Sequence, residues 1–261
     1  MSNLVAMLCE HNDLVMFRDI DIHPVPISSG GFGVVYKGVL PNKKEVAIKA
    51  ISCKTDRDIS RIEREVHFHN RAQKLSRYVC RLLGVLESTD QDNKIRLVME
   101  LYPTTLHDKL KSESEDLETK LKWVNQVMCT VAILHKHGIL HLDLKPANIL
   151  IDQGNNVKLT DFGLSMSNSN VSHCKLGTRH FQPPEYKTPN GAMISKGADV
   201  WACGIILKLA FKEHTKSISD YTRLYKLTVA PMLCPNQNKR CSIKQAAGTL
   251  STLIEKYYHG T

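Results

Sequence analysis

The sequence lacks a long apolar run, since the nearest candidate, residues 200–211, is short and contains Lys208. A helix that spans a bilayer needs about 20 consecutive apolar residues, so we expect no membrane-spanning segment and no membrane partner. The first ten residues also lack a basic segment followed by an apolar core. We therefore expect no secretory signal peptide.

Paired cysteines are absent as well. The eight cysteines stand at positions 9, 53, 80, 129, 174, 203, 234 and 241, and no two of them form a Cys-x-x-Cys pair. This spacing argues against a structural zinc site and against a disulfide framework. A reducing compartment fits best, so we expect the protein in the cytoplasm, with access to the nucleus left open.

Aromatic residues are few, at 6%, and the chain has no block of five basic residues. Its 35 Lys and Arg against 26 Asp and Glu leave a charge of +9, which favours anionic partners such as nucleotides or acidic proteins. Because the excess is spread along the chain, it indicates a solvated surface, and we expect no specific nucleic-acid partner. The length of 261 residues allows one large domain or two lobes, and we expect a monomer.

The N-terminal part predicts a small sheet. Residues 1–19 are weakly patterned, and we interpret them as a leader that packs on the first lobe or partly frays. Residues 20–51 read as three antiparallel strands, with a glycine-rich turn at Gly30, Gly31 and Gly33. Glycine backbone can close over phosphate groups because no Cβ blocks the approach, although a plain hairpin is the alternative.

Lys49 ends the third strand among apolar neighbours, where an uncompensated charge is costly. A helix over residues 56–75 offers Glu63 and Glu65 as partners, and its register favours Glu65. The alternative for Lys49 is an edge position that points to water. With further strands at 79–86 and 94–99, we expect a five-stranded antiparallel first lobe with one helix over residues 20–99, and a hinge at residues 100–103.

Residues 104–261 predict a larger, mainly helical lobe. Helices are expected at 105–111, 117–137, from 199 onward and at 242–258, with a hairpin at 149–160, a long polar loop at 164–179 and an irregular stretch at 212–235. His135 and His137 are expected to cap the second of these helices or to lie on the surface. The buried Asp199 needs hydrogen-bond partners, and we expect the backbone of the loop in the stretch 141–150 to supply them.

The stretch from His141 to Leu150 places Asp143, Lys145 and Asn148 within six residues. An acid at Asp143 can accept a proton from a hydroxyl, Lys145 can neutralise a phosphate, and the Asn148 amide oxygen can bind a divalent cation. The segment Asp161-Phe162-Gly163 follows the expected hairpin and offers a second metal ligand in Asp161.

Taken in order, these segments resemble the eukaryotic protein kinases of the serine/threonine type. The resemblance rests on the glycine-rich turn, Val46-Ala47-Ile48-Lys49, a helix glutamate, His-x-Asp-x-Lys-Pro-x-Asn from His141, Asp161-Phe162-Gly163, Pro183-Pro184-Glu185 and Asp-x-Trp from Asp199, and it covers about residues 20–258. It implies an α+β, bilobal protein kinase fold. It also implies a transferase that uses ATP and Mg2+ to phosphorylate a protein hydroxyl.

The resemblance also implies roles for individual residues. The catalytic set would be Asp143, Lys145, Lys49 and Glu65, and the metal ligands would be Asn148 and Asp161. ATP would be bound by Ile27, Ser28, Gly30, Gly31, Gly33, Val35, Ala47, Lys49, Met99, Glu100 and Tyr102. In this assignment Met99 lies behind the adenine, and the backbone of Glu100 and Tyr102 bonds the purine edge.

Three features depart from the family pattern. Ser28 replaces the first glycine of the loop, and Leu142 replaces an arginine that in many kinases receives an activation-loop phosphate. We therefore expect activity to depend weakly on phosphorylation of Ser165, Ser167, Ser169, Ser172 or Thr178. Asp199 and Arg240 are only 41 positions apart, which predicts shortened substrate-docking helices.

The segment from His141 to Leu150, with leucine in place of arginine at position 142, resembles that of the Mos kinases. This resemblance would imply a MAP kinase kinase as the protein substrate. Other short kinases, including viral ones, can share Leu142. The main alternative for the whole chain is a pseudokinase or scaffold that binds nucleotide or partners without efficient transfer. The intact Lys49, Asp143, Asn148 and Asp161 argue against that alternative.

Overall fold

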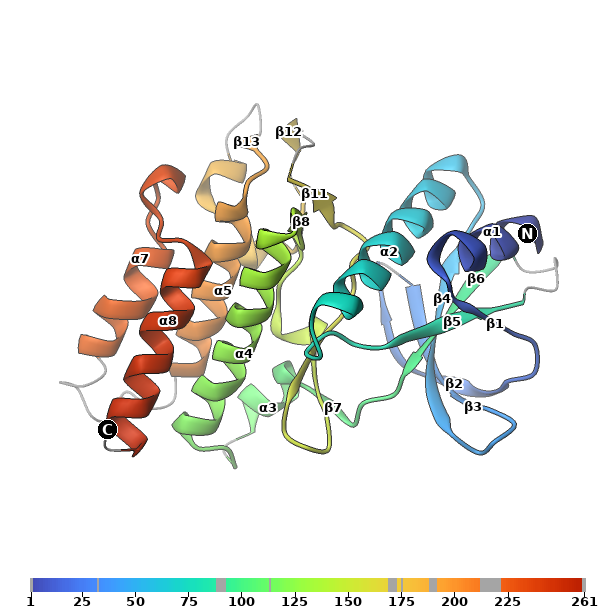
Figure 1. The fold of residues 1–261 in the computed structure, drawn as a ribbon, viewed down its shortest axis with the longest axis horizontal. Helices are drawn as coiled ribbons and strands as arrows, with labels where there is room; N and C mark the ends of the chain where they lie inside the picture. The colour runs from blue at the N-terminus through green and yellow to red at the C-terminus, as the bar shows by residue number, and fades with distance from the viewer. Residues whose placement is uncertain are drawn as a thin grey trace. The chain divides into compact units, whose positions relative to one another are not determined.

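The structure is a computed structural model that describes residues 2–31, 33–87, 93–112, 114–168, 173–174, 176–187, 192–211 and 222–259. Ser169 and Ser172, two of the expected phosphorylation positions, lie outside these ranges. The chain forms two compact units, shown as ribbons in Figure 1: Met1–Pro103 with Asp161–Gly163, and Thr104–Thr160 with Leu164–Thr261. We call them unit 1 and unit 2. Among the residues that the structure describes, no helix is both long and apolar enough to cross a membrane.

Unit 1 is built on a sheet in the order β1-β5-β6-β4-β3-β2. Its strands are β1 Val15–Phe17, β2 Asp21–Gly30, β3 Gly33–Val39, β4 Glu45–Ser52, β5 Leu82–Leu86 and β6 Lys94–Glu100. The predicted meander is present as β2, β3 and β4, which pair antiparallel in sequence order. Pro24 and Pro26 are tolerated because β2 is an edge strand, where a missing N–H leaves no neighbour unpaired.

The count of five strands and one helix was wrong for this sheet, because the expected leader is structured. Helix α1 spans Ser2–Asn12, and β1 adds a sixth strand that pairs parallel with β5. Val5 and Leu8 are 0% and 2% exposed, so α1 contributes to the core instead of fraying. The expected fully antiparallel sheet is therefore mixed.

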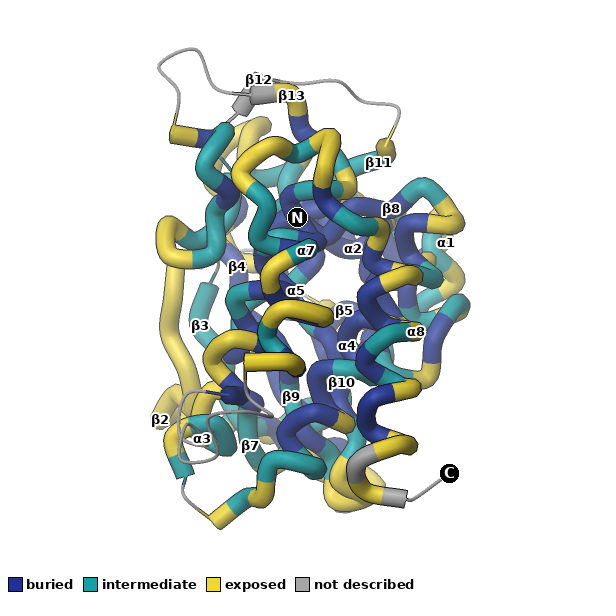
Figure 2. Tube along the Cα trace, turned by 90° about the vertical axis from the view of Figure 1, so that its left-hand side faces the viewer, coloured by how far each residue is buried: buried dark blue, intermediate teal, exposed yellow. Residues whose placement is uncertain are grey.

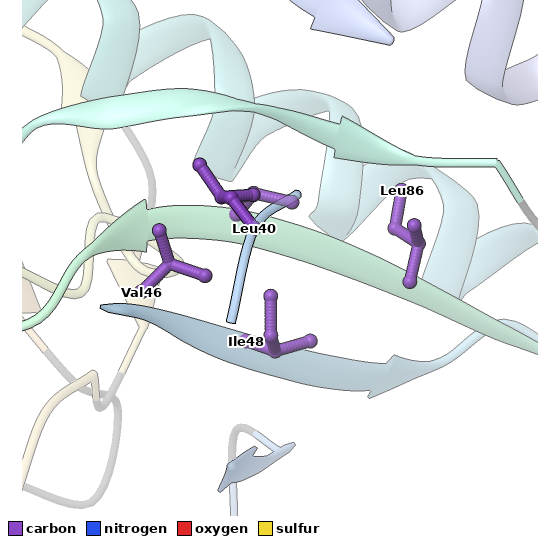
Figure 3. Close-up of a cluster of buried hydrophobic side chains, with 5 residues drawn as sticks. Leu40, Val46, Ile48 and Leu86 are labelled. Carbon is purple, nitrogen blue, oxygen red and sulfur yellow. The ribbon is translucent and has the colours of Figure 1, made fainter. Parts of the chain in front are cut away.

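A cluster of apolar side chains covers one face of this sheet. Figure 3 shows Leu40, Val46, Ile48 and Leu86, which pack together with Val98. Strand residues alternate between faces, so Val46 and Ile48 of β4 lie in this core and leave Ala47 and Lys49 for the other face. The core thereby fixes which side of β4 presents the lysine.

Helix α2, Asp56–Leu75, matches the predicted range. It begins with a capping box in which the Thr55 hydroxyl accepts from the Asp58 N–H and the Asp58 carboxylate accepts from the Thr55 N–H. Ile62, Val66 and Ala72 form its buried face, and Glu65 is buried among them. The start and the register of α2 are thus set by its own sequence.

Unit 2 is mainly helical, with α3 Leu106–Lys111, α4 Leu117–Lys136, α5 Lys196–Phe211, α7 Ala230–Met232 and α8 Ile243–Ile254. Figure 2 shows that much of α4 is buried, consistent with its apolar stripe. Helix α4 packs against both α5 and α8. Single turns lie at Pro146–Asn148, Arg179–Phe181, Pro184–Lys187, Tyr225–Val229, Gln237–Lys239 and Glu255–His259.

Short strands complete unit 2. The predicted hairpin is present as β9 Ile149–Ile151 and β10 Val157–Leu159, with β7 Thr104–Thr105 beside β9. The pairs β8 Ile139–Leu140 with β11 Met166–Ser167, and β12 His173–Cys174 with β13 Ala192–Met193, give order to parts of the expected loop. Of the stretch predicted to be irregular, 212–235, residues 212–221 lie outside the described residues. Residues 222–232 are helical, with a π turn at Tyr225–Val229 between helical residues on both sides.

Candidate active site

Lys49 forms the centre of a charged cluster in unit 1. Its Nζ contacts Glu65 Oε1 and lies 3.0 Å from Asp161 Oδ1, and the residue is 6% exposed. Burial by itself would lower the pKa of Lys49, but the negative charges of Glu65 and Asp161 outweigh it and raise that pKa. Of the two candidate partners on α2, Glu65 is the one that pairs with Lys49, and the amine stays charged.

One face of the sheet collects most of the strand residues that were assigned to ATP. Across β2, β3 and β4, Ser28 is opposite Val35, which is opposite Lys49, and Ala47 is opposite Met99 of β6. Directly opposed residues share a face, so these side chains form a continuous surface around Lys49. Ala47 and Met99 are 8% and 6% exposed. The part of this surface that lies farther from the glycine-rich turn is therefore apolar.

The glycine-rich turn joins this same face. Gly30 is opposite Gly33, and Gly33 has φ +129°, where an added Cβ would lie 2.6 Å from the Ala50 carbonyl oxygen. Residue 33 must therefore be glycine. At Gly30 and Gly31 an added Cβ would meet nothing within 4 Å, so the space beside them is open. Ile27 lies at a register shift, and strand alternation does not assign it to this face.

The residues after β6 are held by side-chain contacts. The Tyr102 hydroxyl donates to Glu100 Oε2 at 2.7 Å, and burial together with that carboxylate raises the pKa of Tyr102. The Glu100 N–H donates to the Arg81 carbonyl at 2.9 Å. A purine bonded by the backbone of Glu100 would therefore use the carbonyl oxygen of that residue.

Asp143 in unit 2 has both carboxylate oxygens engaged. Oδ1 accepts from the N–H and the hydroxyl of Thr178, each at 2.8 Å, and Oδ2 accepts from Lys145 Nζ at 2.9 Å and Asn148 Nδ2 at 3.1 Å. Lys145 also donates to the Thr178 hydroxyl at 2.9 Å. The carboxylate is 1% exposed, so its orientation is fixed by these four hydrogen bonds.

Asp199 at the start of α5 organises the backbone before Asp143. Its two oxygens accept from the N–H groups of His141 at 2.9 Å and Leu142 at 2.8 Å, as predicted. Burial would raise the pKa of Asp199, but the hydrogen bond and charge of His135 and the His141 N–H outweigh it and lower that pKa. The prediction for His135 was wrong, because it is 6% exposed and lies 2.9 Å from Asp199.

Leu142 is a core residue. It is 6% exposed and packs with Leu140, Tyr186, Ile194 and Ala198. Its φ of +66° is unusual for a residue with a side chain. The hydrogen bond from its N–H to Asp199 Oδ1 stabilises that conformation. An apolar side chain in this core cannot receive a phosphate.

Two of the expected phosphorylation positions, Ser165 and Thr178, have hydroxyls that are already engaged. Ser165 is fully buried, and its hydroxyl donates to the His141 carbonyl at 3.4 Å. The Thr178 hydroxyl is engaged by Asp143 and Lys145. Neither hydroxyl is available in this conformation, and the weak dependence of activity on phosphorylation stays a prediction.

Sequence reasoning missed two contacts. It named Thr178 only as a phosphorylation candidate, and it named Glu185 and Arg240 without pairing them. Arg240 forms a bidentate pair with Glu185 at 2.7 and 2.6 Å. The Arg240 side chain is 1% exposed and needs a carboxylate nearby, but the local sequence pattern indicates neither its burial nor its partner.

The residues present fit the groups that the resemblance implies. Asp161 carries a carboxylate, and the Asn148 amide nitrogen donates to Asp143, which leaves Oδ1 as the amide atom suited to a cation. Carboxylate and amide oxygens are the ligands that Mg2+ prefers. The charged Lys49, set beside open glycine backbone, suits a polyphosphate.

Comparisons with known proteins agree with this arrangement. The protein kinase domain family matches residues 25–239. A G-type lectin S-receptor-like serine/threonine-protein kinase of Arabidopsis thaliana is 35% identical, over 69% of this chain and 22% of its own length. Sucrose non-fermenting protein kinase 1 of Fusarium virguliforme is 32% identical over 69% and 26% of the two chains.

A third relative aligns along nearly the whole chain. The serine/threonine-protein kinase ppk16 of Schizosaccharomyces pombe is 30% identical, over 98% of this chain and 37% of its own. The chain thus spans less than half the length of these curated relatives. With the match covering the sheet of unit 1, the Asp143 segment and Asp199, this chain belongs to the protein kinase domain family, and its α+β fold is the bilobal kinase fold.

Proposed function

We propose that the protein is an ATP-dependent serine/threonine protein kinase. The observation that carries the proposal is the Asp143 carboxylate, buried and held by Lys145, Asn148 and Thr178. A scaffold that only binds partners has no need of a buried carboxylate fixed by four hydrogen bonds. The names of the relatives above, all serine/threonine or protein kinases, support the same activity.

In the proposed reaction, the substrate hydroxyl attacks the γ-phosphorus of ATP, and the bond from that phosphorus to the bridging oxygen of ADP breaks. Asp143 orients the hydroxyl and accepts its proton, while Lys145 offsets charge on the migrating phosphoryl group. Lys49, held by Glu65, binds the α- and β-phosphates, and Gly30, Gly31 and Gly33 cover the triphosphate. Mg2+, when bound through Asn148 and Asp161, would neutralise the phosphate oxygens.

The adenine would lie on the apolar part of the sheet face. Val35, Ala47 and Met99 supply contact area there, and the backbone of Glu100 and Tyr102 supplies polar partners. Ser28, in place of a glycine, adds a side chain at the edge of this surface.

The test is transfer of radiolabelled phosphate from ATP to a generic protein substrate. The Asp143→Asn variant keeps the size of the side chain but removes the proton acceptor, so we expect kcat to fall by about 1,000-fold. Equal transfer by the two proteins would overturn the proposal and favour the pseudokinase alternative. A control at an exposed carboxylate of unit 2, Glu255→Gln, should transfer at the wild-type rate.

A narrower proposal concerns the substrate. We propose a MAP kinase kinase as the protein substrate and the cytoplasm as the compartment, with the chain acting as a monomer. Leu142 supports the substrate. The eight scattered cysteines, no two of which form a Cys-x-x-Cys pair, support the compartment. A peptide-library phosphorylation screen tests the substrate, because a preference unlike the activation segment of those kinases excludes it.

A further inference from the structure

The N-terminal helix α1 packs against both α2 and β5 within unit 1. Figure 1 shows α1 close to α2, although the two are separated by the first four strands of the chain. Val5 and Leu8 are buried, whereas Glu10 of the same helix is exposed. The inner face of α1 is therefore part of the core on which α2 rests.

A chain of hydrogen bonds joins the end of α1 to α2 and β5. Asn70 Nδ2 donates to the Asn12 carbonyl at 2.5 Å, and Gln73 Nε2 donates to Asn70 Oδ1 at 2.9 Å. The Leu82 N–H in turn donates to Gln73 Oε1 at 2.8 Å. Asn70 is 5% exposed, so removal of its amide leaves the Asn12 carbonyl without an easy substitute.

Strand β1 gives α1 a second attachment. Val15 is opposite Gly84, and an added Cβ at Gly84 would lie 2.0 Å from the Val15 carbonyl oxygen. The Glu87 N–H donates to the Phe17 carbonyl at 2.7 Å, which ties the end of β1 to the segment after β5. The close approach of β1 to β5 is possible because residue 84 is glycine.

Helix α2 is contacted from two directions. At about 100° per residue, Asn70 lies roughly 140° around the helix from Glu65. Glu65 reaches Lys49, and Asn70 reaches α1. A rotation of α2 that breaks the first contact also strains the second.

From these contacts we propose that α1 and β1, residues 2–17, form a positioning element that holds α2 in the orientation that brings Glu65 to Lys49. The segment is thus a built-in activator of the kinase, and its release lowers phosphoryl transfer. This inference rests on the proposed kinase function, but its structural half, the coupling of α1 to α2, is measurable without any activity.

Two variants test the coupling, each with a matched control. Leu8→Ala removes part of the core packing of α1. Asn70→Ala removes the hydrogen bond from α2 to the Asn12 carbonyl at the end of α1. Glu10→Ala and Lys74→Gln alter exposed positions of the same two helices. Leu8→Met keeps the apolar volume and should restore wild-type behaviour. The readouts are kcat and KM for ATP, measured well below the melting temperature, and amide hydrogen exchange over 56–75.

We expect kcat to fall by about 10- to 100-fold in both test variants, because a small displacement of a catalytic group has an effect of that size. Exchange in α2 should rise in both, and the controls should match the wild type. A lower melting temperature with unchanged kcat and unchanged α2 exchange would overturn the proposal. If Leu8→Ala does not fold, the kcat and the α2 exchange of Asn70→Ala test the proposal. If the wild type transfers no phosphate, the proposed function fails, and α2 exchange alone decides the coupling.

Discussion

The side chain of Thr178 sets the immediate environment of Asp143. Gly177, the residue before it, has φ +89°, and an added Cβ there would lie 2.5 Å from the Leu142 carbonyl oxygen. This close approach brings the Thr178 hydroxyl to both Asp143 and Lys145. The hydroxyl therefore links the proposed base to the proposed phosphate-binding lysine.

Replacement of Thr178 separates the effect of this hydroxyl from that of the methyl group. We expect Thr178→Val to lower kcat by about 10- to 100-fold, because Asp143 loses one of the hydrogen bonds that orient it. Thr178→Ser keeps the hydroxyl and should stay within about threefold of the wild type. Steady-state phosphorylation of a generic protein substrate measures both. A valine variant as active as the serine variant would contradict the role.

At this scale the sequence predicted local groupings better than distant partners. The contact of Asp143 with Lys145 and Asn148 could be predicted without the conformation of the loop, because the three residues lie within six positions of the chain. Lys49 and Glu65 were paired because a buried lysine needs a carboxylate. Thr178 lies 35 positions after Asp143, beyond the β9–β10 hairpin, and nothing in its local sequence pattern indicates that the two residues meet.

Among the elements, the first turn of α5 holds the segment before Asp143 in place. Asp199 accepts from two consecutive backbone N–H groups and from His135 of α4. Leu142, which carries the second of these N–H groups, has φ +66°. This conformation costs about 1–3 kcal/mol when a side chain is present. The buried carboxylate offsets this cost, so the segment depends on the charge of Asp199.

The charge of Asp199 makes a pH-dependent contribution to stability. Its pKa is lowered in the folded protein from about 3.9 in the unfolded chain. The contribution is therefore complete above about pH 4 and is lost as the pH falls through the lower folded pKa. An asparagine has one acceptor oxygen and no charge, so we expect Asp199→Asn to lower the free energy of unfolding by about 3 kcal/mol at neutral pH.

Urea denaturation followed by tryptophan fluorescence measures this difference. The gap between wild type and Asp199→Asn should hold from about pH 7 to about pH 4 and narrow as the pH is lowered further, because protonation then removes the same charge from the wild type. Glu255→Gln, at an exposed carboxylate, is the control. A gap that stays constant with pH would show that the charge of Asp199 does not stabilise the fold.

Prediction of the elements succeeded where one period dominates the pattern. The range of α2 was predicted to the residue, and α4 ends one residue earlier than expected. Helix α1 was missed because Leu4 to Cys9 is an unbroken run of small and apolar residues, with no helical spacing to read. Strand β1 has three residues, and its pairing with β5 is set by the tertiary fold.

Across the whole molecule, both tryptophans belong to one unit. The chain has two, Trp123 and Trp201, and both lie in unit 2. Trp201 also lies beneath the Arg240 guanidinium, 5.0 Å from its ring centre. Tryptophan fluorescence therefore reports on unit 2, whereas amide exchange in β4 reports on unit 1.

This division gives the Glu185 to Arg240 pair a distinct signature. In Glu185→Gln the buried guanidinium loses its counter-charge but keeps the carbonyl oxygens of Gly197, Cys234 and Pro235 as acceptors. We expect the free energy of unfolding of unit 2 to fall by about 3 kcal/mol, the lower end for a broken buried pair. Tryptophan fluorescence in urea should show the shift.

The matched control is Glu118→Gln, which breaks a partly exposed i,i+4 pair with Lys122 in the same unit, where Nζ and Oε1 are 2.6 Å apart. A helix pair of this kind contributes about 0.5 kcal/mol or less, so this variant should unfold close to the wild type. Equal shifts in the two variants would contradict the role of the buried pair. If amide exchange in β4 stays at the wild-type rate while the tryptophan transition moves in Glu185→Gln, the two units unfold separately, because a single cooperative transition would shift both signals together.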